Sequence, residues 1–168
     1  SAILRTSDAM ANDVAITTRY GYRDPYAFTE MFNRTATRVG AFWTLLYKVI
    51  DNTNNVIAKV DNAEGSDRDK RILKGQAMAL RAFAYHNLAS FYQLSYLKDK
   101  TALTVPIYTE PTTTASRPQP MATHEALYTF IIQDLNEAAV LLEDYQRSNA
   151  EKYLVDQHVV YGLLARAY

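Results

Sequence analysis

The longest helical pattern in the chain lies at residues 67–94, which read DRDKRILKGQAMALRAFAYHNLASFYQL. Apolar or small residues recur there at steps of three and four, which predicts an amphipathic helix over about 67–95. Its predicted buried stripe consists of Leu73, Ala77, Leu80, Ala84, Leu88, Phe91 and Ser95. Ser66 and Asp69 resemble a capping box at its start. Several alanines in the stretch would let a partner helix approach closely.

Three further stretches carry the same periodicity, and they predict helices near 37–61, 123–143 and 155–168. Thr123 is the expected cap of the helix near 123–143. Between the second and third helices, residues 98–122 contain four prolines and three consecutive threonines, so we expect an extended loop packed along the helices. Two helical hairpins separated by this loop predict an all-α fold of stacked, tetratricopeptide-like hairpins. The residues expected in the core are Trp43, Tyr47, Leu80, Leu135 and Leu164.

The expected organisation is a single domain over 1–168, the front part of a longer protein. Residues 1–36 form an irregular, aromatic-rich segment with a short helix near 3–10. The first hairpin occupies 37–97, the loop 98–122 and the second hairpin 123–168.

Composition excludes several classes of function. The 168 residues carry 18 basic and 18 acidic side chains, which is not the basic excess of a nucleic-acid binder. There is no cysteine, so thiolate metal sites and cysteine nucleophiles are excluded. No apolar run approaches the length that spans a bilayer. The 13 tyrosines suit either helix packing or a surface that stacks on sugar-like ligands.

Metal and catalytic motifs are not evident, so we expect neither a cofactor nor an enzyme. The three histidines lack the spacing of a helical metal pair, and they are interpreted as structural. Residues 61–69 are rich in oxygen ligands but do not match a calcium loop, which favours a capped turn between helices. Tyr85, Tyr92 and Tyr96 favour a seam between helices over a ligand site. Arg81 could stack on Tyr85 or pair with a carboxylate on a neighbouring helix.

The candidate ligand-binding residues lie in a non-helical, aromatic stretch near the start of the chain. They are Arg19, Tyr20, Tyr22, Arg23, Asp24 and Tyr26. In an extended segment the three tyrosines would share one face and could stack on sugar rings, while arginine and aspartate bind vicinal hydroxyls. A loop that buries these tyrosines against the helices is the equally weighted alternative.

Several segments together resemble the SusD/RagB-like nutrient-binding lipoproteins of Bacteroidetes outer membranes. The helical matches are Trp43-x3-Tyr47-x2-Ile50-x3-Asn54, Gly75-Gln76-Ala77-Met78-Ala79-Leu80-Arg81-Ala82 with Tyr85, Leu88 and Tyr92, Ile131-Ile132-x-Asp134-Leu135-x-x-Ala138, and Leu163-Leu164-Ala165-Arg166-x-Tyr168. The loop matches are Val105-Pro106-Ile107 and Arg117. The resemblance covers about residues 43–168, and Gly75-Gln76 replaces the acidic start usual in the family.

The resemblance implies a non-catalytic protein that binds a glycan or peptide and delivers it to a TonB-dependent, SusC-like transporter. It also implies display on the cell outer membrane through an N-terminal lipidated cysteine, which this sequence lacks, as expected if the anchor was removed. The family's second half, with part of any ligand site, is missing as well. The alternative is a tetratricopeptide-type adaptor that binds a peptide or protein partner in a concave groove. In that case inner-helix residues, rather than loops, would bind the partner.

Overall fold

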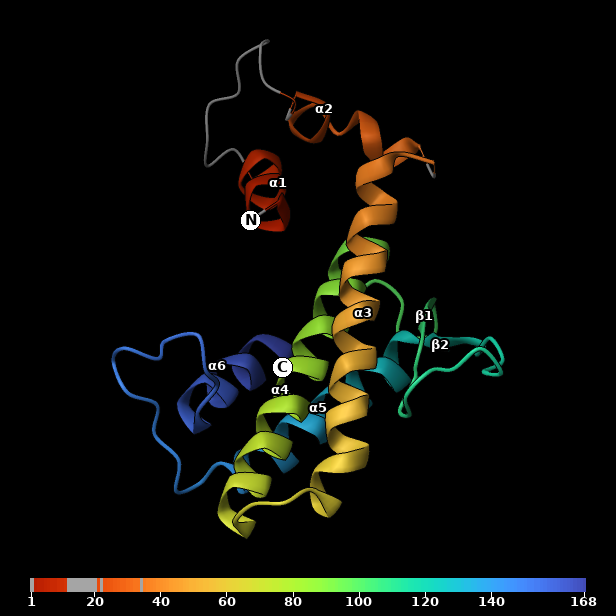
Figure 1. Cartoon of the computed structure of the whole chain (residues 1–168). Helices are drawn as coiled ribbons and strands as arrows, with labels where there is room; N and C mark the ends of the chain where they lie inside the picture. Colours follow the sequence, from red (N-terminus) through yellow and green to blue (C-terminus); the bar gives the residue numbers. More distant parts are fainter. Residues whose placement is uncertain (1, 12–20, 22, 34) are drawn as a thin grey trace. The chain divides into compact units, whose positions relative to one another are not determined.

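The computed structural model describes residues 2–11, 21, 23–33 and 35–168, which form two compact units, residues 1–45 and 46–168 (Figure 1). The first unit contains helix α1 (Ala2–Met10), the one-turn helix α2 (Arg23–Tyr26), the 3-10 helix η1 (Thr29–Phe32) and the start of α3. Helix α1 contacts α2. The short helix expected near 3–10 is therefore confirmed, whereas residues 23–32 are more helical than the sequence suggested.

The second unit is built from helical hairpins, as predicted. Helix α3 (Thr37–Lys59) ends in the 3-10 helix η2 (Val60–Asn62), and α4 (Asp67–Tyr92) returns antiparallel to it (Figure 1). Helix α5 (His124–Leu141) packs against α4, and α6 (Gln157–Ala167) packs against α5. All four predicted helices are present, and their ends lie within three residues of the predicted ones.

Local capping explains where these helices begin. The Ser66 hydroxyl accepts a hydrogen bond from the Asp69 backbone N–H, and Thr123 accepts one from that of Ala126. Asp156 caps α6 in the same way through Val159. These side chains satisfy backbone donors that have no partner inside the helix.

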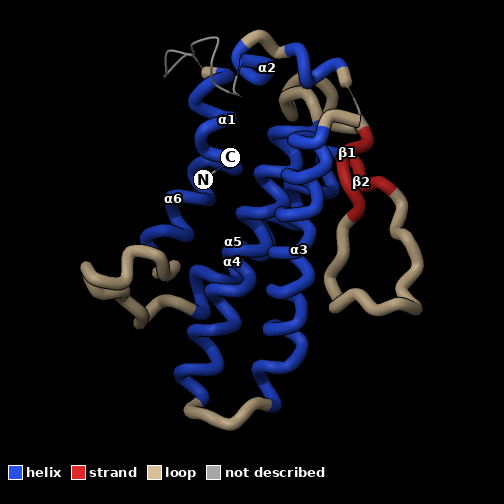
Figure 2. The backbone as a smooth tube through the Cα atoms, turned by 45° about the horizontal axis from the view of Figure 1, so that its top comes forward, coloured by secondary structure: helices blue, strands red, loops and turns tan. Residues whose placement is uncertain are grey.

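A small sheet, which the sequence did not predict, closes the proline-rich loop. Strand β1 (Leu103–Pro106) pairs antiparallel with β2 (Met121–Thr123), and the register is irregular between Leu103 and Pro106. Figure 2 shows the two strands and the long connection between them. Val105 is fully buried, so the base of the loop packs against the helices as expected, whereas residues 113–121 are exposed and do not lie along them.

The core lies where α3, α4 and α5 meet. Tyr85, Leu88, Leu127, Ile131 and Leu135 are fully or almost fully buried. Leu164 of α6 is also buried, whereas Trp43 and Tyr47 are only half-buried.

The predicted burial of Leu80 is wrong, because 41% of its surface is exposed. Helix α4 turns its small residues, among them Ala82 and Ala89, toward the core and leaves Leu80 on the outer side. Periodicity alone could not choose between an alanine-rich face and a leucine-bearing face of the same helix. Tertiary packing decided it, since the buried side of α4 combines the alanines with Tyr85 and Leu88.

Gly75 lies in a close contact between α4 and the C-terminal end of α5. A Cβ atom built on Gly75 would lie 2.8 Å from Leu142 Cγ and 3.0 Å from Leu141 Cβ. Real Cβ atoms essentially never come as close as the first of these contacts, so a larger residue would push the helices apart.

Candidate functional site

Three of the six predicted ligand residues lie on α2. Arg23, Asp24 and Tyr26 are all exposed, and the Thr29 hydroxyl lies 3.3 Å from Asp24 Oδ1. Arg19, Tyr20 and Tyr22 lie outside the described residues. Arg23–Tyr26 form a helical turn and not the extended backbone that was expected. The expectation that Tyr26 shares one face of an extended segment with the other tyrosines therefore does not hold for Tyr26.

Among the residues that the structure describes in this segment, two aromatic rings are exposed. Tyr26 exposes 45% of its surface and Phe28 exposes 40%. Phe28 has a left-handed backbone with φ of 58°, a conformation uncommon for a residue with a bulky side chain. The arrangement presents a ring, a guanidinium and a carboxylate on one short turn, which are the groups that bind sugar faces and hydroxyls.

A residue that the sequence analysis did not single out braces this turn. Arg38, in the first turn of α3, donates from Nη2 to the Gly21 carbonyl at 2.8 Å and from Nε to Glu30 Oε2 at 2.8 Å. Along the sequence, one of its two partners therefore precedes α2 and the other follows it. One feature of the sequence could have pointed to Arg38: it is a positive charge at the predicted N-terminus of a helix, where the helix dipole disfavours a cation.

A second polar cluster is buried in residues 46–168. Arg81 of α4 binds Asp134 of α5 through Nε–Oδ2 and Nη2–Oδ1 bonds of 2.8 Å, and donates from Nη1 to Asn54 Oδ1 of α3 at 2.7 Å. Burial raises the pKa of the Asp134 carboxyl, while the hydrogen bonds from Arg81 oppose that rise. Of the two roles considered for Arg81, pairing with a carboxylate of a neighbouring helix is confirmed; its guanidinium also lies 5.1 Å from the Phe130 ring centre.

This cluster holds the loop that follows β1. The Asn54 amide donates to the carbonyls of Tyr108 at 3.0 Å and Glu110 at 3.1 Å. Further along, Asp51 Oδ1 accepts from both the backbone N–H and the hydroxyl of Thr112. The base of the loop is thus fixed to α3.

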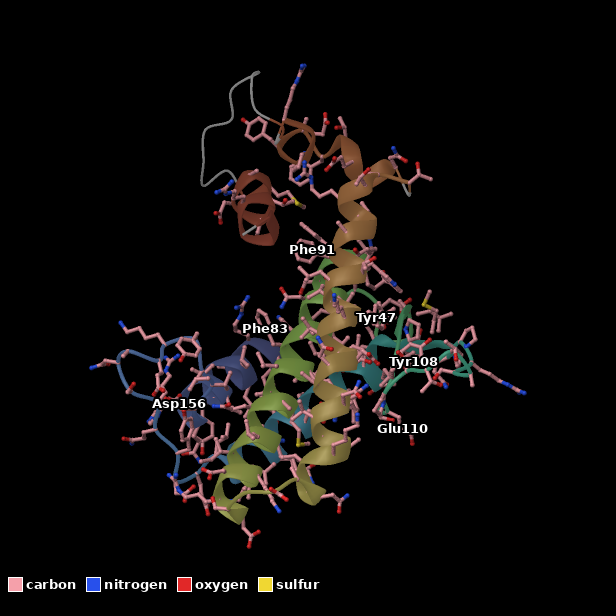
Figure 3. All side chains as sticks on the ribbon, viewed as in Figure 1. Tyr47, Phe83, Phe91, Tyr108, Glu110 and Asp156 are labelled. Carbon is pink, nitrogen blue, oxygen red and sulfur yellow. The ribbon has the colours of Figure 1, made fainter. Side chains whose placement is uncertain are left out.

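Tyrosines complete the attachment between helices and loop (Figure 3). The Tyr47 hydroxyl donates to the Pro106 carbonyl, and the Tyr85 hydroxyl accepts from the Tyr108 backbone N–H. Both Tyr85 and Tyr108 meet the Tyr47 ring edge to face. Burial raises the pKa of Tyr47 far above its usual value and that of Tyr85 to about 12. Tyr85 is therefore a neutral packing residue, as the seam interpretation predicted.

The histidines and carboxylates of the described residues do not gather around a common point. No group of three or more histidine, aspartate or glutamate side chains in that part of the chain could hold a metal ion. His86 and His124 both contact the Tyr128 ring. The pKa of His86 is lowered mainly by burial and to a smaller extent by the positive charge of Arg166. Nor is any helix in the described ranges long and apolar enough to cross a bilayer.

Comparison with known proteins gives the fold a family. Residues 4–168 match the SusD-like family described as "Starch-binding associating with outer membrane". The chain is similar to a SusD-like carbohydrate binding protein from Bacteroides vulgatus ATCC 8482, with 39% identity, a TM-score of 0.88, and coverage of 98% of this chain and 34% of that one. No curated protein matches it.

Other solved structures are similar as well, and two of them serve as examples. A laminarin binding SusD-like protein is 26% identical, with a TM-score of 0.69 over 88% of this chain and 29% of that one. A SusD superfamily protein from Bacteroides thetaiotaomicron VPI-5482 shares the fold at 24% identity, with a TM-score of 0.73 over 92% of this chain and 33% of that one. The chain thus spans about a third of the length of the solved structures it matches. Because the family match extends over nearly the whole sequence, the chain belongs to the SusD-like family.

Proposed function

We propose that the protein is a non-catalytic, glycan-binding protein of the cell surface. The observation that carries this proposal is the 39% identity to a carbohydrate binding protein over 98% of the chain. The family description, which names starch binding and the outer membrane, supports the ligand class and the location. Delivery of the glycan to a TonB-dependent, SusC-like transporter and attachment through a lipid anchor complete the proposal.

The proposed binding residues are those predicted from the sequence, in the segment 19–26. Tyr26 offers an exposed ring that can cover the C–H face of a sugar, and Arg23 and Asp24 offer hydrogen bonds to its hydroxyls. In contrast, the buried charges Arg81 and Asp134 satisfy each other and are out of reach of a ligand. This division supports binding at an exposed turn rather than acid–base chemistry in the helical interior.

The test uses the full-length protein and gels that contain soluble starch or laminarin, in which binding slows migration. We expect Tyr26→Ala to weaken retention about fivefold, the scale of one aromatic contact. Tyr153→Ala is the matched control, because Tyr153 is 79% exposed in the connection before α6. Retention of the wild type by neither polysaccharide contradicts the proposal, and equal retention of both variants places the site elsewhere.

A further inference from the structure

The contacts within the short turn around α2 are too weak to stabilise its conformation by themselves. Helix α2 has four residues, and so short a helix is not stable alone in water. The left-handed backbone of Phe28 is strained for a residue with a bulky side chain, and neighbouring contacts must offset that strain. The contact between Thr29 and Asp24 is exposed and long, so it contributes little.

Arg38 supplies the missing restraint from outside the turn. Its Nη2 holds the carbonyl of Gly21, before α2, and its Nε holds the carboxylate of Glu30, after α2. The side chains of Arg38 and Glu30 are each only 24% exposed, so solvent screens the pair less than it screens a surface ion pair.

The position of Arg38 is unfavourable for α3 itself. A positive charge in the first turn opposes the helix dipole, and the first turn of α3 has no acidic residue to offset it. A neutral or acidic residue at position 38 would stabilise the N-terminus of α3 better than arginine does. The compensating partner, Glu30, belongs to the segment after α2, so the arrangement favours the turn at the expense of the helix.

We infer that Arg38 is a positioning residue for the candidate ligand segment: it fixes Gly21 and residues 23–30, so that the Tyr26 ring keeps an orientation in which it can stack on a sugar. This inference rests on the proposed function. The planar guanidinium is required, because it donates in two directions at once from a rigid fork. A lysine keeps the charge opposite Glu30 but cannot reproduce both hydrogen bonds.

The first measurement needs no ligand. In the full-length protein, the backbone N–H groups of Ala27 and Phe28 donate to the Arg23 and Pro25 carbonyls. We expect Arg38→Lys to speed their hydrogen exchange about tenfold, as the loss of one charge-assisted hydrogen bond predicts. Exchange in α4 and α5, and the melting temperature, should stay the same. Arg68→Lys is the matched control, since Arg68 meets Asp144 on the surface at 3.7 Å. Unchanged exchange at Ala27 and Phe28 overturns the inference.

The second measurement is a double-mutant cycle on retention by starch and laminarin gels. Arg38→Lys should weaken binding about fivefold in the wild type and hardly at all in a Tyr26→Ala background, because it acts through that ring. Glu30→Gln, which leaves the bond to Gly21 in place, should have a smaller effect than Arg38→Lys. The inference is overturned if the losses of binding in Arg38→Lys and Tyr26→Ala add up in the double variant. It is also overturned if Arg38→Lys speeds hydrogen exchange at Ala27 and Phe28 but is retained by the gels as strongly as the wild type. A wild type that neither gel retains overturns the proposed function instead, and the exchange result then decides whether Arg38 holds the turn.

Discussion

Arg81 and Asp134 form a two-point ion pair between α4 and α5, with two nitrogen–oxygen distances of 2.8 Å and side chains only 6% and 4% exposed. Asn54 of α3 accepts a third hydrogen bond from the same guanidinium. The Arg81 guanidinium thus joins α3, α4 and α5, and Asn54 connects this group to the loop after β1. Because both charges are removed from water, the pair matters most when only one partner is lost.

Asp134→Ala should lower the free energy of unfolding by about 3–5 kcal/mol, since it leaves the buried Arg81 charge without its carboxylate. Replacing both partners, as in Arg81→Met with Asp134→Leu, should recover much of the loss. Urea unfolding measures both. Arg68→Met, at the exposed pair with Asp144, is the control and should cost less than about 1 kcal/mol. A similar small loss in Asp134→Ala would show that the pair is not isolated from water.

Gly75→Ala should destabilise the fold by about 1–3 kcal/mol, because the new methyl group meets Leu142 at 2.8 Å. Gly162→Ala on α6 is the matched control: nothing lies within 4 Å of its Cβ position, so the better helix propensity of alanine should dominate. Thermal unfolding should therefore shift in opposite directions for the two variants. A shift in the same direction would show that α4 and α5 can separate at little cost.

Leu88→Ala should cost about 2–5 kcal/mol, because its side chain is fully buried. Leu80→Ala should cost less than about 1 kcal/mol, since 41% of Leu80 is exposed and little cavity forms. Both are leucine-to-alanine changes on one helix, so chemical denaturation compares the two faces directly. Equal losses would contradict the orientation of α4.

Tyr85→Phe should loosen the base of the β1–β2 loop, because the Tyr108 backbone N–H loses the oxygen that accepts its hydrogen bond. We expect a loss of about 1–3 kcal/mol in stability. Limited proteolysis should also show faster cleavage at 105–108. Tyr161→Phe, on the exposed side of α6, is the control. An unchanged cleavage pattern in Tyr85→Phe would show that the Asn54 contacts hold the loop without it.

The pH dependence of stability should carry a contribution from His86. Burial and Arg166 lower its pKa below the ordinary value of 6.5. Between that lowered value and 6.5, the unfolded chain binds more protons than the folded one, so stability rises with pH and is lost as pH falls. His86→Gln should give a shallower slope of unfolding free energy from about pH 5 to 7. Identical slopes in the variant and the wild type would exclude this contribution.

The sequence alone determined the four long helices and placed their ends to within three residues. Ser66 and Thr123 cap helices because a side-chain oxygen reaches a backbone N–H three residues away, and such contacts depend only on local spacing. The prolines of the loop excluded a helix for the same local reason. The resemblance to SusD-like proteins rests on short residue motifs, such as Trp43-x3-Tyr47 and Leu80-Arg81-Ala82, which are properties of the sequence alone.

The tertiary structure decided what depends on distant neighbours. On α4 the leucines do not share one fate, because Leu88 is buried and Leu80 is exposed, and only the packing of α5 against α4 decides which of them enters the core. The partner of Arg81 lies 53 residues away, and the partners of Arg38 lie 8 and 17 residues away across irregular backbone. Hydrophobic periodicity does not encode such pairs, because it records whether a face is apolar and not what lies opposite it.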